Sequence, residues 1–197
     1  RHVITAIPGT MQRLAHEPNF GLASPDERGR QSALDFTREI VSAARQLHAT
    51  VIAIEVHSAP TDHADAAAFA ASLDTLMSER IEGDPEFLIE HCDAVGTPFA
   101  GEKRFLSLED EVRVAKDTGV GVTINWGRSA LETRNASTPL AHVRLAAEAG
   151  VLRAFMASGA GAGAPEYGAE WSDAHLPHVD HESSSLLTDD ALAQCIS

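Results

Sequence analysis

Three short apolar segments decide the fold of this chain, and they read VIAIEVHS (51–58), FLIEHCDA (87–94) and VGVTINWG (120–127). Their polar positions Glu55, Glu90 and Asn125 follow one another at intervals of 35 residues. A strand, a crossover helix and two loops of a βαβ unit occupy roughly 30–35 residues. Because parallel α/β proteins carry their chemistry at the carboxyl ends of strands, we expect the two acids and the amide to face one shared pocket.

Two further apolar segments predict strands at 2–7 and 151–156, so five strands alternate with helices along the chain. The strands are apolar on both faces, which is typical of buried parallel strands. We expect loops after Pro8 and Gly9 and again after Asn125. Capping residues and helical periodicity predict helices that begin at or next to Ser24, Asp62, Ser107, Thr138 and Thr188.

Two architectures fit five alternating strands and helices, an open doubly wound sheet and a (β/α)₈ TIM barrel. A doubly wound sheet gathers its site at one switch point, whereas here every strand end carries polar residues, which favours the barrel. A whole barrel needs about 250 residues. We therefore expect residues 1–197 to form a single domain, an incomplete barrel of about five β/α units without its first two strands and its last strand.

The composition limits the partners of the protein. Its formal net charge of −14 argues against nucleic acid and anionic membranes, because both repel an acidic surface. The two cysteines, Cys92 and Cys195, show no disulfide pattern and favour a reducing compartment. No apolar run approaches about 18 residues and no signal peptide is visible, so we expect a cytoplasmic protein with a small-molecule partner. The oligomeric state stays open, a homodimer included.

Glu55 and His57 lie on the same face of their strand, because residues two apart point the same way. A buried carboxylate needs a partner or a metal, and carboxylates on neighbouring strands raise each other's pKa. One interpretation makes Glu55, His57 and Glu90 catalytic groups. The other makes Glu55 and His57 an internal ion pair that closes the top of the barrel.

The sequence Glu90-His91-Cys92-Asp93 holds three potential ligands in four residues. Neighbouring side chains diverge by half a turn, so they cannot all reach one ion. We expect Glu90, alone or with Asp93, to be the ligand. Cys92 is interpreted as a small buried hydrophobe rather than a nucleophile.

Trp126 and Arg128 follow Asn125 within three residues, and we expect all three to contact substrate. Arginine at a strand end can hold a carboxylate or phosphate in a bidentate fashion. The alternative for Arg128 is a surface ion pair with Glu132.

The segment SGAGAG (158–163) follows the fifth strand. Its amides could bind an anion, but no Rossmann or Walker pattern surrounds them, so a lid or a tight loop is the favoured interpretation. We expect Ser158 and, further along, Asp173 to contact substrate. His175 is a candidate metal ligand, because Trp171 and Asp173 flank it and could orient its ring.

The segments LIEHCDA and VTINWGRSALE resemble the xylose-isomerase-like TIM barrels of the sugar phosphate isomerase and epimerase superfamily. More specifically, TAIPGTMQRL, IEVHSAP, IEHCDA and SDAHLPH resemble an uncharacterised bacterial branch of that superfamily, a domain-of-unknown-function group. The resemblance covers nearly the whole chain, from the third strand of the family to a point before its eighth.

The resemblance implies a divalent metal (Mn, Mg, Co or Zn) held by Glu, Asp, His and Glu. Glu90 matches the first ligand, but Asn125 stands at the position of the Asp, and Arg128 stands where a His often follows. The third ligand has no match on the fifth strand, where His175 from the next loop is the substitute, and the last would lie beyond Ser197. Neutral Asn is a poor ligand for a hard cation.

Three functions compete. The first is an isomerase or epimerase of a small carbohydrate or its phosphate, with proton transfer by Glu90 and Glu55 and with or without a metal. The second is a lyase or hydrolase of polyhydroxylated compounds on the same barrel, since one fold hosts many reactions. The third is a carbohydrate-binding protein that has lost its metal site and its catalysis.

Overall fold

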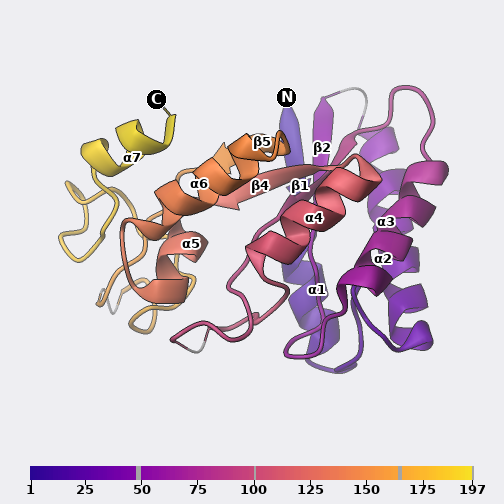
Figure 1. Cartoon of the computed structure of the whole chain (residues 1–197), viewed down its shortest axis with the longest axis horizontal. Helices are drawn as coiled ribbons and strands as arrows, with labels where there is room; N and C mark the ends of the chain where they lie inside the picture. The colour runs from indigo at the N-terminus through magenta and orange to yellow at the C-terminus, as the bar shows by residue number, and fades with distance from the viewer. Residues whose placement is uncertain (48–49, 100, 164–165, 197) are drawn as a thin grey trace.

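The fold is built on one sheet of five parallel strands, which a computed structural model describes for residues 1–47, 50–99, 101–163 and 166–196. The strands lie side by side in the order in which they occur along the chain. Figure 1 shows the chain from its N-terminal strand to its C-terminal helix. Their bounds are β1 (His2–Thr5), β2 (Val51–Val56), β3 (Glu86–Glu90), β4 (Gly121–Asn125) and β5 (Leu152–Met156).

The strand order decides between the two architectures. Crossovers between parallel strands are right-handed, so a strictly sequential order places every connecting helix on the same face of the sheet. A doubly wound sheet reverses its order at a switch point and has helices on both faces. The expected fold is confirmed: the chain is an incomplete (β/α) barrel. Its connecting helices are α2 (Glu27–Gln46), α3 (Ala66–Ser78), α4 (Leu108–Thr118) and α6 (Thr138–Glu148).

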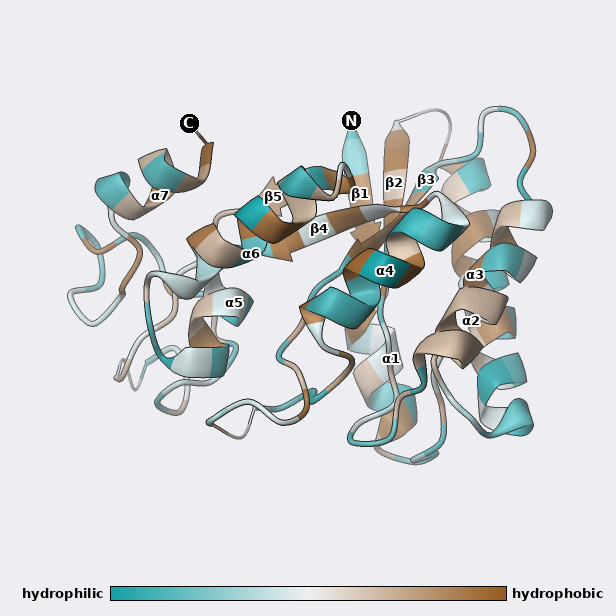
Figure 2. Cartoon of the chain, in the orientation of Figure 1, coloured by the Kyte–Doolittle hydropathy of each residue, from teal (hydrophilic) through white to brown (hydrophobic). Residues whose placement is uncertain are grey.

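The hydrophobic core lies between the sheet and these helices. Ile54, Ile89 and Ile124 point outward from the middle strands and are fully buried against apolar helix residues such as Leu73 and Ala115. Burying an aliphatic side chain of this size contributes about 1.5–3 kcal/mol. Figure 2 shows the same division, with helices that carry brown residues on one side and teal residues on the other. The inner face of the sheet is thereby left to the polar residues of the site.

The helix boundaries follow capping chemistry, with two corrections. Ser107 caps α4 as expected, since its hydroxyl accepts a hydrogen bond from the Asp110 amide, and Gly119 ends the helix at φ +75°. The N-cap of α2 is Asp26 rather than Ser24, and the N-cap of α3 is Asp65 rather than Asp62. In both cases an aspartate two or three residues further along the chain accepts the hydrogen bond from the first turn.

Two helices stand where loops were expected. Pro8 does not open a loop but occupies the first turn of α1 (Ile7–Leu14), where its missing N–H costs nothing. After β4 the chain turns directly into α5 (Trp126–Thr133), and the Asn125 side chain accepts a hydrogen bond from the Arg128 amide at 3.3 Å. The helix α7 (Asp189–Ile196) follows Thr188 as expected. Among the described residues, no helix is long and apolar enough to span a bilayer.

Candidate functional site

The carboxylate of Glu90 lies at the centre of the inner face, at the carboxyl end of β3, and the residue is 1% exposed. Its Oε2 accepts hydrogen bonds from Thr5 Oγ1 at 3.1 Å and from His57 Nε2 at 2.8 Å. Its Oε1 lies 2.6 Å from Arg128 Nη1 and 3.4 Å from Asn125 Nδ2. These five residues, which we call the Glu90 cluster, come from β1, the end of β2, β3, β4 and α5.

Electrostatics keep Glu90 ionised. Burial alone would raise the pKa of its carboxyl, but the hydrogen bond from His57 and the Arg128 guanidinium outweigh burial and hold the pKa at about 2. The same attraction raises the pKa of Arg128 above its ordinary value, although burial opposes it. Glu90 therefore carries a fixed negative charge, balanced by a buried cation.

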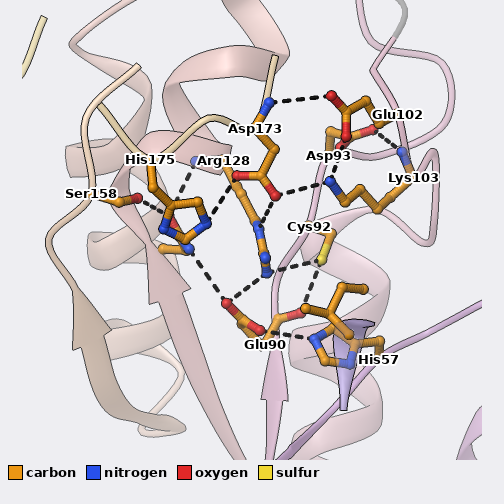
Figure 3. Close-up of polar contacts among 12 residues, drawn as sticks. His57, Glu90, Cys92, Asp93, Glu102, Lys103, Arg128, Ser158, Asp173 and His175 are labelled. Atoms are coloured by element: carbon orange, nitrogen blue, oxygen red, sulfur yellow. Dashed lines mark hydrogen bonds and ion pairs between the residues drawn. The ribbon is translucent and has the colours of Figure 1, made fainter. Parts of the chain in front are cut away.

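Arg128 connects this cluster to the long loop after β5. Its Nε donates to Asp173 Oδ2 at 3.0 Å, and Lys103 Nζ donates to the same oxygen at 2.9 Å (Figure 3). The ring of His175 approaches the other Asp173 oxygen at 3.3 Å. Two buried cations thus share one carboxylate, and these contacts hold the loop residue Asp173 on the barrel mouth.

Asn125 is fixed from two sides. Its Oδ1 accepts from Ser158 Oγ at 2.6 Å and from the Arg128 amide, while its Nδ2 points toward Glu90 and Met156. The carboxamide therefore has its donor end toward the carboxylate and its acceptor end toward the helix and the loop.

Glu55 differs from Glu90 although it lies on the same inner face. Its Cα pairs with Leu88 in the sheet, so it sits one inward position below Glu90. Burial, together with the negative charge of Glu90, raises the pKa of Glu55 to about 7, and Thr123 and the Arg128 cation offset only part of this. One acid of the pair is thus held ionised while the other titrates near neutrality.

The structure brings most of the predicted site residues together and separates a few. His57, Glu90, Asn125, Arg128, Ser158, Asp173 and His175 form a connected set of polar contacts, and Glu55 lies beside them. Trp126 lies elsewhere: its side chain is fully buried in an apolar cluster with Ala130, Leu131 and Leu187. The helical turn that begins at Asn125 points the indole away from the inner face.

Three pairings considered from the sequence are wrong. His57 pairs with Glu90 rather than with Glu55, since the β2–β3 register sets the end of β2 opposite the end of β3. Arg128 is not in a surface ion pair with Glu132, because α5 buries it against Glu90. Asp93 does not act with Glu90 as a ligand. Its Oδ2 instead accepts hydrogen bonds from the backbone amides of residues 103 and 104 and so fixes the loop that precedes α4.

The glycine run after β5 forms a tight loop. Gly159 and Leu176 exchange backbone hydrogen bonds of 2.7 and 3.0 Å, and the Gly161 carbonyl accepts from the Trp171 amide. A Cβ at Gly161 would lie 2.0 Å from the Ser184 carbonyl oxygen, so only glycine permits this approach. The amide of Gly159 is already bonded to Leu176 within this paired loop, which argues against anion binding there.

The residues around Glu90 do not fit the divalent metal that the resemblance implies. The position that a cation would take against Glu90 Oε1 is held by the Arg128 guanidinium at 2.6 Å. Asn125 turns its Nδ2 donor, not its oxygen, toward that carboxylate. Among the described residues, Glu90 and His175 do not belong to any group of three ligand side chains within ion-binding distance. Glu90 and His175 therefore do not form the expected metal site.

Two residues of the site were missed from the sequence. Thr5 ends a strand of four residues, and Lys103 lies in a Gly-containing loop whose path the sequence does not determine. Lys103 is 5% exposed, and a buried lysine is rare. That rarity would have drawn attention to it, but the burial is known only from the structure.

The sequence profile of a family described as "Domain of unknown function (DUF4862)" matches residues 1–197. The chain belongs to this family. The DUF4862 chain is 37% identical over 204 residues to the "Uncharacterized protein STM3670" of Salmonella typhimurium strain LT2. The match covers 99% of this chain and 64% of the relative, so the chain spans less than two thirds of that protein's length.

One solved structure aligns with the DUF4862 chain at a TM-score of 0.48 and 17% sequence identity. It comes from Anabaena variabilis and is described as a "putative sugar phosphate isomerase/epimerase". The alignment covers 70% of this chain and 47% of that one.

Proposed function

We propose that this DUF4862 protein is an isomerase or epimerase of a small carbohydrate, in which Glu55 moves the proton. The observation that carries the proposal is the pair of carboxyl groups on the inner face, Glu55 with a pKa of about 7 and Glu90 held ionised. Pairs of carboxyl groups with separated pKa values are the usual basis of acid and base assignments in active sites. A general base works best when its pKa lies near the operating pH.

The remaining groups supply orientation. Burial and the charge of Glu90 keep the pKa of Glu55 at about 7, and Glu90 itself is fixed by Arg128 and His57. His57 Nδ1 is buried and has no hydrogen-bond partner among the described residues, which leaves it to accept from a substrate hydroxyl. In this mechanism Glu55 removes a proton from the carbon beside a carbonyl. In an isomerisation it returns that proton to the former carbonyl carbon, while the proton of the neighbouring hydroxyl passes to the former carbonyl oxygen. In an epimerisation the carbon takes a proton from water on the opposite face, and Glu55 releases its own proton to water.

We propose a neutral carbohydrate rather than its phosphate. Two buried cations, Arg128 of the cluster and Lys103 beside it, already share the Asp173 carboxylate. A phosphate would have to displace that carboxylate and leave it buried without its partners, which is costly.

Proton exchange tests the proposal whichever product is formed. The protein is incubated in D₂O with a panel of aldoses, ketoses and their phosphates, and deuterium at the carbon next to the carbonyl is followed by NMR. We expect exchange on a neutral sugar with a rate that rises with pH through about 7, since Glu55 accepts a proton only when deprotonated. Glu55→Gln is expected to slow this exchange by roughly 10²–10⁴-fold.

Glu86→Gln is the matched control, because Glu86 is an exposed carboxylate at the N-terminal end of β3, whereas Glu90 lies at its C-terminal end. It should leave exchange unchanged. Exchange that survives in Glu55→Gln at the wild-type rate would disprove the role of Glu55. Exchange confined to sugar phosphates would disprove the choice of a neutral substrate.

A non-catalytic carbohydrate-binding protein is the second candidate, and one observation favours it. Four side chains of the chain itself already contact the Glu90 carboxylate: Thr5, His57, Asn125 and Arg128. Such a saturated carboxylate is suited to rigid binding as well as to catalysis. Saturable sugar binding by calorimetry, together with no exchange for any sugar of the panel, would select this function over the first.

A further inference from the structure

A second polar centre lies on the other side of β3, one residue beyond Glu90. Among the described residues, His91, Glu132 and His142 are the one group whose ligand atoms all lie within 4.8 Å of one another. His91 Nε2 is 3.2 Å from Glu132 Oε1, and His142 Nε2 is 3.5 Å from Glu132 Oε2. We call these three residues the His91 cluster. It lies beneath the helices, where the end of β3 meets α5 and α6.

These separations are close to the distance between neighbouring ligands of one metal ion. Zinc bonds of 2.0–2.1 Å to nitrogen and oxygen place neighbouring ligand atoms about 3.3–3.4 Å apart in tetrahedral geometry. The two separations, each to a different oxygen of Glu132, lie on either side of this value. Imidazole nitrogens with one carboxylate are a ligand set that suits Zn²⁺ and its neighbours in the transition series rather than Mg²⁺ or Ca²⁺.

The far nitrogen of each ring is held in the way that metal-bound histidines usually are. His91 Nδ1 lies 2.6 Å from Glu111 Oε2, and His142 Nδ1 lies 3.0 Å from Ser129 Oγ. Glu111 is itself fixed by the Ser58 hydroxyl. A proton on each Nδ1, donated to such a partner, leaves Nε2 free to bind an ion.

The charges of the cluster also call for a cation. Glu111 and Glu132 are buried carboxylates, and among the described residues neither has a Lys or Arg partner. One protonated imidazole would neutralise half of their charge, whereas a divalent ion would neutralise all of it. A buried charge without compensation is costly.

We propose that His91, Glu132 and His142 bind one divalent transition-metal ion of the Zn²⁺ class. The site ties β3 to α5 and α6, with Glu111 of α4 behind it. It is separate from the Glu90 cluster, because successive residues of a strand point to opposite faces. The proposal does not depend on the sugar chemistry, so either can fail alone.

The test uses the tag-free, full-length protein after treatment with a chelator. Zn²⁺ affinity is measured by competition with a chromophoric chelator, and Co²⁺ is added separately to record its visible spectrum. We expect one Zn²⁺ per chain and the strong visible absorption of four-coordinate Co²⁺. His142→Ala should weaken Zn²⁺ binding by at least about 100-fold and abolish that absorption.

His181→Ala is the matched control, since His181 is exposed in the loop before α7 and lies outside the cluster. It should bind Zn²⁺ as the wild type does. Circular dichroism reports whether His142→Ala is folded; if it is not, His142→Gln is measured in the same way. Absent stoichiometric binding in the wild type, or binding that survives the loss of His142 at wild-type affinity, would overturn the proposal.

Discussion

The two sides of β3 carry two buried polar centres that begin at consecutive residues and differ in their cations. On the inner side, Glu90 is balanced by the Arg128 guanidinium at 2.6 Å. On the outer side, the carboxylates that face His91 contact imidazole nitrogens and, among the described residues, neither Lys nor Arg. The comparison teaches that a fixed side-chain cation closes the first centre to metal, whereas the second has ligands without such a cation.

The titration of the two inner acids sharpens the same contrast. Glu90 is neutralised by an arginine that belongs to the chain, and its charge helps to raise the pKa of Glu55 to about 7. The His91 cluster has one acid, Glu132, and two imidazoles whose Nδ1 atoms both have a side-chain partner. The inner centre is therefore suited to proton transfer and the outer centre to an ion.

The largest expected effect is on the inner side. Arg128→Met removes the cation between Glu90 and Asp173 and leaves both carboxylates buried. Breaking a buried pair in this way costs about 3–5 kcal/mol, which urea denaturation measures as the free energy of unfolding. Arg113→Met, at an exposed arginine on α4, is the control and should cost less than about 0.5 kcal/mol. A loss below about 1 kcal/mol for Arg128→Met would mean that Glu90 is not balanced by this residue.

A smaller effect concerns the coupling between the two acids. The negative charge of Glu90 disfavours a second charge nearby, so Glu90→Gln should lower the pKa of Glu55 from about 7 by one unit or somewhat more. The freed Arg128 cation acts in the same direction. Carbon-13 NMR of the glutamate carboxyl groups follows the titration, with Glu55→Gln to assign the signal. An unchanged or raised pKa of Glu55 would show that the charge of Glu90 does not act on it.

The smallest effect is on the outer side. Ser129→Ala removes the hydroxyl that contacts His142 Nδ1 but none of the three proposed ligands. We expect Zn²⁺ affinity to fall by about tenfold, in the range typical for residues that orient a ligand. The pKa of Glu55 should stay the same in this variant, since the two centres lie on opposite faces. A shift of Glu55 equal to that in Glu90→Gln would show that the centres are not independent.

Much of this arrangement could be predicted from the sequence. The 35-residue interval of Glu55, Glu90 and Asn125 placed all three on the inner face, because strand alternation and βαβ length are local properties. Ser107 and Gly119 marked the ends of α4 for the same reason. Trp126 and Arg128 were both expected to bind substrate, but the turn of α5 sends them to different places.

The sequence by itself determined the barrel-type order of elements, the polar strand ends and the opposite directions of Glu90 and His91, since each depends on residues close together in the chain. Only the tertiary structure decided which charges meet. Arg128 joins Glu90 and Asp173, and Glu132 joins His91 and His142, across separations of up to 45 residues. Such contacts depend on the positions of the helices on the sheet. Those positions are set by the packing of the whole core rather than by any local pattern.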